Sequence, residues 1–98
     1  MEAEPSTGVE KALELGLHGV SPQPSRGALR VDFTLGDGGP ATLELVDVAG
    51  RRVIARDLTA LGAGRHAVDL RAGLPVGVYL VRLTQAGRAL VRKAVILR

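Results

Sequence analysis

Few side chains in this sequence could carry out chemistry, and the two histidines come first because they could bind a metal. His18 and His66 lie far apart, without the paired spacing of zinc ligands, and the chain has no cysteine. Asp37 lies in a Gly-Asp-Gly-Gly run, but it lacks the further carboxylates that supply the roughly six to eight oxygens around Ca²⁺. We therefore expect both histidines to be structural and no metal to be bound.

The remaining acidic and hydroxyl side chains do not form a catalytic group. Asp32, Asp57 and Asp69 fall on separate predicted strands, without a matching histidine or nucleophile. No serine stands in a nucleophile-elbow motif, and no glycine-rich loop both follows a strand and opens a helix. Asp47 fits a turn better than it fits acid–base chemistry. The sequence therefore predicts a protein that is not an enzyme and that needs no cofactor.

Charge and aromatic content narrow the classes of ligand. The net charge of +3 comes from eleven arginines and two lysines against ten acidic residues, and most of the arginines are spread singly along the chain. The only aromatic side chains are Phe33 and Tyr79, because tryptophan is absent. Single-stranded nucleic acids and sugar rings are bound by stacking on exposed aromatic groups. Nucleic-acid and carbohydrate binding are therefore disfavoured, and the expected partner is a protein.

The elements that hold these side chains are predicted to be short strands. Ninety-eight residues are enough for one hydrophobic core, and β-rich runs broken by glycine and proline recur about every ten residues, as in a sandwich. We expect an all-β, immunoglobulin-like antiparallel β-sandwich of about seven strands over residues 12–98, after a tail or linker at residues 1–11. A helix over Val9–Leu15 is an alternative to the first strand that Gly16 and Gly19 disfavour. The predicted strands are Ala12–Val20, Ala28–Leu35, Ala41–Val48, Arg52–Leu58, Gly64–Leu70, Val76–Thr84 and Arg88–Leu97.

Alternation of apolar and polar residues predicts which side chains face the core. In Ala28–Leu35 the apolar residues occupy every second position, which defines an inward face. Val76–Thr84 is nearly continuous in apolar residues, and such a run predicts a central strand covered on both faces. Tyr79 within it is expected in or near the core, with its hydroxyl on a backbone partner at the sheet edge.

Turn residues are expected to separate the strands. Pro22 and Pro24 cannot donate a hydrogen bond to a β-ladder, so they break the sheet. Asp47 is expected to bond the backbone of a tight turn in which Gly50 takes a positive φ. The Gly36–Pro40 segment is expected to be a flexible loop.

No segment of the sequence has the composition of a membrane or export signal. Met1–Val9 is acidic and polar, unlike a secretory signal peptide, and no run approaches the ~20 apolar residues of a transmembrane helix. We therefore expect no membrane insertion. If the protein is exported, we expect the signal to lie upstream of Met1, in a larger protein of which this chain is a part.

Five short segments occur in an order that is more specific than any of them alone. They are Ser21–Pro24, Leu45–Val53, Leu61–His66, Leu74–Leu83 and Lys93–Arg98. Over Val20–Arg98 this ordered set resembles the C-terminal sorting domain of the type IX secretion system, a family related to the immunoglobulin-like domain of flagellar hook-capping proteins. Gln23 departs from the family, which usually has asparagine between the two prolines, whereas the prolines themselves are present.

The resemblance implies a sandwich at the end of a multidomain bacterial protein that is secreted or held at the cell surface. It implies recognition of the terminal region by protein secretion machinery, so the candidate partner contacts are Lys93, Leu97 and Arg98. A lysine that discourages edge-to-edge pairing is the commoner explanation of Lys93. The residues expected to be structural within the motifs are Pro22, Pro24, Asp47, Gly50, Gly77 and Tyr79.

A second function is compatible with the same fold. An immunoglobulin-like spacer or assembly module would contact neighbouring protein domains through exposed strand edges. Fold cannot separate the two functions, because one fold serves many. The position of the domain in the parent protein can separate them. A sorting module lies at the extreme C-terminus, whereas an assembly module can be followed by more sequence. The sequence does not predict the oligomeric state.

Overall fold

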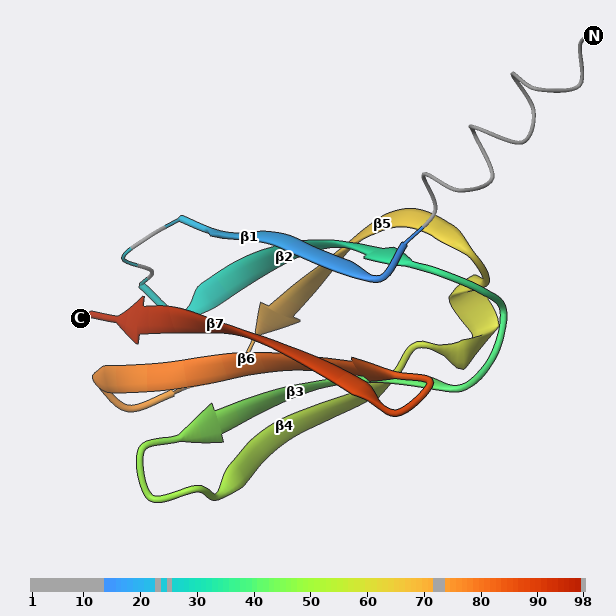
Figure 1. Cartoon of the computed structure of the whole chain (residues 1–98). Coiled ribbons are helices and arrows are strands. Elements are labelled where there is room, and N and C mark those ends of the chain that lie inside the picture. The colour runs from blue at the N-terminus through green and yellow to red at the C-terminus, as the bar shows by residue number, and fades with distance from the viewer. Residues whose placement is uncertain (1–13, 23, 25, 72–73, 98) are drawn as a thin grey trace, which may run out of the picture.

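Two antiparallel sheets make up the computed structural model, which describes residues 14–22, 24, 26–71 and 74–97 (Figure 1). Their strands are β1 (Gly16–Ser21), β2 (Ala28–Leu35), β3 (Ala41–Asp47), β4 (Arg52–Asp57), β5 (Gly64–Arg71), β6 (Gly77–Gln85) and β7 (Arg88–Ile96). A short 3-10 helix, η1 (Thr59–Leu61), lies in the connection between β4 and β5.

The two sheets stack as a sandwich. One sheet has the strand order β1-β2-β5 and the other has the order β4-β3-β6-β7. The chain crosses from one sheet to the other in three connections, which are β2–β3, β4–β5 and β5–β6. Figure 1 shows β1 and β7 side by side, at the border where one edge strand of each sheet meets the other. The expected all-β sandwich is therefore confirmed.

Strand positions agree with the sequence-based expectation except at the beginning. The strands β2 to β7 begin and end within one residue of the predicted bounds. The first strand was expected from Ala12, and this start is wrong: Glu14 and Leu15 lie before the strand, which begins at Gly16. Residues 12 and 13, and most of the helical alternative over Val9–Leu15, lie outside the described residues.

The core between the sheets is almost entirely aliphatic. Phe33 is its fully buried aromatic ring, and leucine and valine side chains from both sheets surround it. Burying each such side chain contributes about 1.5–3 kcal/mol, so the stability comes from many medium-sized contributions. The fully buried side chains include Leu29, Val31, Phe33 and Leu35 of β2, Leu43 and Leu45 of β3, Leu70 of β5, Val81 and Leu83 of β6, and Ile96 of β7.

A β-bulge in β1 changes the side that its residues face. The register with β2 shifts between Leu17 and Gly19, so His18 is the extra residue. Leu17 is paired with Phe33 and Val20 with Val31, and both pack against the core. Strict alternation would have placed Leu17 and Val20 on opposite faces. The bulge therefore keeps the apolar side of this edge strand against the core along its whole length.

The central strand β6 is covered on one face only, so the prediction that both faces are buried is wrong. Tyr79, Val81 and Leu83 point into the core, whereas Val78 and Leu80 are each 41 % exposed. Among the described residues there are two sheets and no third layer that would cover the outer face of β6. The continuous apolar run of β6 therefore places two aliphatic side chains on the surface.

Substitution of Val81 by aspartate tests this assignment of faces. Val81 is fully buried, and an unpaired carboxylate there costs several kcal/mol out of a typical margin of about 5–15 kcal/mol. We expect Val81→Asp to be unfolded at 25 °C by far-ultraviolet circular dichroism. Val78→Asp, on the same strand but the outer face, should melt within a few degrees of the parent protein. Equal melting of the two variants would contradict the assignment.

Candidate functional site

The candidate contacts of the last strand lie on β7, an edge strand of the four-stranded sheet. Lys93 is exposed and is paired with Leu80 of β6. Leu97 follows the strand and is 40 % exposed, whereas its neighbour Ile96 is buried in the core. Arg98 lies outside the described residues. The structure thus places Lys93 on β7 and Leu97 directly after it, both on the surface, where a partner could reach them.

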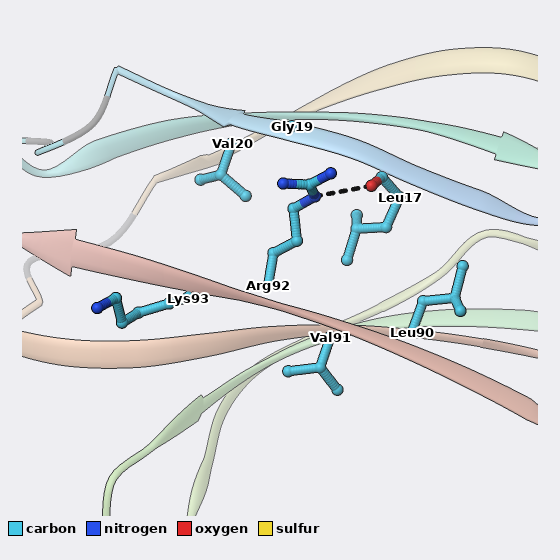
Figure 2. A pocket seen from close by; sticks show the side chains of 7 residues that line it. All are labelled: Leu17, Gly19, Val20, Leu90, Val91, Arg92 and Lys93. Atoms are coloured by element: carbon cyan, nitrogen blue, oxygen red, sulfur yellow. Dashed lines mark hydrogen bonds between the residues drawn. The ribbon is translucent and has the colours of Figure 1, made fainter.

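A groove separates β7 from β1 along the border of the two sheets. Its lining includes Leu17, Gly19 and Val20 of β1 and residues 90–93 of β7. Figure 2 shows the Arg92 side chain extending from β7 across this groove toward β1. Its Nε donates a hydrogen bond to the carbonyl oxygen of Leu17 at 2.8 Å. Arg92 therefore links the edge strands of two sheets that share no β-ladder.

Arg92 is a residue that sequence reasoning did not single out. Its pairing with Val81, and its parity with the buried residues Ala94 and Ile96, place it on the inward side of β7. A charged side chain on that side needs a hydrogen-bond partner. The alternation along β7 could be predicted from the sequence. The hydrogen-bond partner of Arg92 could not, because it lies on β1, whose position beside β7 the sequence does not give.

Asp47 and Gly50 form the turn between β3 and β4. The Asp47 carboxylate accepts hydrogen bonds from the backbone N–H of Ala49 at 3.0 Å and of Arg51 at 2.9 Å, and from the Arg51 Nε at 2.9 Å. These bonds hold the pKa of Asp47 below its ordinary value, and the one from the Arg51 backbone N–H has the largest effect. Gly50 has φ 86°, and its N–H donates to the Asp47 carbonyl oxygen. The role of both residues is to close this turn.

Tyr79 lies at the start of β6 with its ring in the core. Its hydroxyl donates a hydrogen bond to the Pro75 carbonyl oxygen, four residues earlier, at 2.6 Å. The arrangement matches the tyrosine corner of immunoglobulin-like sandwiches and fixes the entry of the chain into β6. A Cβ atom at Gly77 would meet the Tyr79 ring at 3.8 Å, an ordinary contact, so space alone does not require glycine there.

The two prolines of the first motif lie beyond the end of β1. Pro22 and Pro24 are both exposed and outside any strand, and the Ser21–Pro22 peptide bond is cis. β1 ends at Ser21, so the sheet stops where these residues can no longer donate to a ladder. Gln23, between the two prolines, lies outside the described residues.

Glu44 forms an ion-pair group that the sequence did not indicate. It lies on the outer face of β3, yet it is only 8 % exposed. Arg82 of β6 donates to its Oε1 through Nε at 2.9 Å and Nη2 at 2.7 Å, and Arg52 of β4 donates to its Oε2 at 2.9 Å. The hydrogen bonds from Arg82, followed by the one from Arg52, lower the pKa of Glu44. One carboxylate thus ties three adjacent strands together.

Gln85 anchors the Gly36–Pro40 loop, which was expected to be flexible, so that expectation is corrected. Gln85 is buried at the end of β6. Its Oε1 accepts from the Gly36 N–H at 2.9 Å, and its Nε2 donates to the carbonyl oxygens of Asp37 and Gly39. Asp37 also accepts from the Gly39 N–H at 2.7 Å. The Asp37 carboxylate therefore stabilises the loop itself.

The two histidines each have a hydrogen-bond partner within the fold. The His66 Nε2 donates to the Gly62 carbonyl oxygen at 2.8 Å, and its ring packs on Phe33 with a centroid distance of 5.7 Å. The His18 Nε2 lies 2.7 Å from the Thr34 hydroxyl oxygen. Among the described residues, no three histidine, aspartate or glutamate side chains gather where they could hold a metal ion.

Exposed strand edges and a groove between β1 and β7 are the features of this structure that a protein partner could contact. Within the part of the chain that the structure describes, no helix has the length and apolar character needed to cross a bilayer. A family model described as a secretion system C-terminal sorting domain matches residues 19–97. No curated protein matches the chain. The match begins within β1 and includes every later strand.

Replacing Glu44 by glutamine tests the ion-pair group through the pH dependence of stability. Because folding lowers the pKa of Glu44 below its ordinary value of 4.5, its contribution is present above that pH and is lost as the pH falls through the folded pKa. We expect Glu44→Gln to reduce the free energy of unfolding at pH 7 by about 1–3 kcal/mol. In urea unfolding, the difference from the parent should shrink steadily below pH 4.5.

A matched control for this measurement is the exposed pair of Arg30 and Asp69, whose closest atoms are 3.3 Å apart. Both side chains are about half exposed, so Asp69→Asn should change stability by at most about 1 kcal/mol. The free energies of unfolding of Glu44→Gln and of the parent could instead differ by the same amount from neutral to acid pH. That result would show that the carboxylate charge does not stabilise the fold.

Proposed function

The chain belongs to the family of secretion system C-terminal sorting domains, and from this premise we propose that it is the recognised module of a larger exported bacterial protein. Domains of this family are sorting signals for type IX secretion, and they mark proteins that are secreted or attached to the cell surface. The observation that carries the proposal is the family match over residues 19–97.

The proposed partner is the protein secretion machinery. Members of the family act as sorting signals and not as enzymes, so the surface, rather than a pocket with reactive groups, is the functional part. Recognition includes the exposed side of β7, where Lys93 and Leu97 are accessible. The position of β7 at the edge of its sheet supports this choice, because a partner can contact an edge strand without opening the core.

In this proposal the remaining N-terminal residues have a different task. Residues 1–11 join the sandwich to the preceding part of the exported protein, and residues 12–98 form the sorting module. The family match starts at residue 19, within β1, and leaves residues 1–11 outside it, which supports a separate N-terminal segment. The cargo can then fold independently of the module.

Export of a fluorescent cargo tests the proposal. A fluorescent protein fused ahead of residues 14–98, with a cleavable secretory signal, should reach the medium or the surface of a bacterium that has the type IX system. The same fusion should remain in the periplasm when the system is deleted. Fractionation and fluorescence of each compartment measure the result. Lys93→Ala, which should leave the melting temperature within a few degrees of the parent, tests the β7 contact separately through a reduced exported fraction.

Retention of the intact fusion in the periplasm, with the domain folded and soluble, would contradict the sorting function. Such a result in a host closely related to the source would favour the spacer or assembly module. Removal of residues 88–98 is not a clean test of recognition, because Ala94 and Ile96 of β7 are fully buried and the fold would be lost with them.

A further inference from the structure

The two outer faces of the sandwich differ in chemistry. On the three-stranded sheet the outward positions are polar or small, and Arg30 pairs with Asp69 across β2 and β5. Sheets that face water normally carry such residues. The outward positions of β2 and β5 are Arg30, Asp32 and Thr34, and Arg65, Ala67 and Asp69.

The outer face of the four-stranded sheet is aliphatic toward the end that carries the β3–β4 turn and the start of β6. Among the described residues, seven of the eight exposed large hydrophobic side chains lie on or beside this sheet, Leu61 being the exception. The aliphatic face, as we define it, consists of Val48, Val53, Val76, Val78, Leu80 and Val91. All six are at least 41 % exposed.

The members of the aliphatic face lie on strands of the four-stranded sheet or in the connections beside them. Val78 and Leu80 are successive outward residues of β6, and Leu80 is paired with Val46 of β3. Val91 of β7 lies opposite Arg82, one outward position beyond Leu80. A bulge in β4 adds Val53 next to Val46, and Val53 lines a shallow groove together with Val48, Val76 and Val78. The patch is therefore continuous across the sheet.

Positive charge borders the aliphatic face. Arg51, Arg52, Arg82 and Lys93 surround it, and the two carboxylates on the same border, Glu44 and Asp47, are already engaged by three of these arginines. The excess of cations favours a partner whose apolar surface is bordered by aspartate or glutamate. A second copy of this chain would bring the same excess of positive charge, so self-association through this face is disfavoured.

We propose that the aliphatic face is the docking surface for a protein of the secretion machinery, one with an apolar patch rimmed by carboxylates. The inference rests on the proposed sorting function and assigns the face through which it works. A continuous exposed apolar patch on one face, beside a polar opposite face, is the mark of an interaction surface. A lipid surface fits less well, because sites at the membrane interface use tryptophan and tyrosine anchors, and both aromatic side chains of this chain are buried.

The first test compares export of variants on the two outer faces. Val78→Thr/Leu80→Thr places two β-branched residues that suit a strand in β6 and removes apolar contact, and Lys93→Glu reverses a bordering charge. Each should lower the exported fraction at least tenfold while leaving the melting temperature within a few degrees of the parent. Ala67→Thr on the polar face is the matched control and should be exported as well as the parent.

The outcomes separate this inference from the sorting function. If the parent fusion is not exported, the sorting function itself fails. If the parent is exported and Val78→Thr/Leu80→Thr is exported equally well, the sorting function stands and the docking face is wrong. Loss of export in the Ala67→Thr control as well would also overturn the assignment to one face.

A photo-crosslinking amino acid identifies the occupant directly. Placed at position 80, it should join the exported fusion to an outer-membrane component of the type IX system, whereas at position 67 it should give no such product. A crosslink at position 80 to a second copy of the fusion, supported by a dimer in sedimentation velocity, would overturn the proposal. Binding of the purified domain to vesicles of anionic phospholipid, abolished by Val78→Thr/Leu80→Thr, would overturn it in favour of a lipid surface.

Discussion

The contact between the inner faces of the two sheets is the constraint on which the rest of the structure depends. The sheets share no β-ladder, and the chain has no cysteine that could join them. Phe33 is the one aromatic ring with no exposed surface, and the surrounding leucine and valine side chains supply the remaining buried area. Since each contributes only a few kcal/mol, every strand must supply apolar side chains to the inner face. The bulge in β1 is one consequence, because it turns Val20 inward as well as Leu17.

Side chains that bond the backbone complete the borders of this core. Gln85 anchors the loop between β2 and β3, Tyr79 anchors the chain before β6, and Arg92 joins β7 to β1. Each satisfies backbone groups that no sheet ladder reaches, and each fixes the place where a strand enters or borders the sandwich. Because these anchors hold β6 and β7, the outward side chains of both strands form a stable surface. A docking face on a rigid sheet costs little ordering entropy when a partner binds.

The strands β2 to β7 and the Asp47–Gly50 turn could be predicted because they depend on neighbouring residues. Alternation placed β2 to β7 within one residue, and the Asp47–Gly50 turn follows from side-chain chemistry within five positions. The outer face of β6 could not be predicted, because a continuous apolar run is equally compatible with burial on both faces. Glu44 with its two arginines, Gln85 with its loop and Arg92 with Leu17 depend on pairings between distant segments. The aliphatic face likewise appears only when β4, β6 and β7 are placed together.

The central claim is that the folded sandwich is engaged through the outer face of its four-stranded sheet, and methyl nuclear magnetic resonance tests it most directly. The domain, with ¹³C-labelled leucine and valine methyl groups, is titrated with the isolated outer-membrane complex of the type IX system. The account predicts that the methyl signals of Val78, Leu80 and Val91 shift or broaden first, while those of the buried Val81 and Leu83 keep their positions. Unchanged signals from the outer face while other surface methyl groups respond, or loss of dispersion in the core signals, would contradict it.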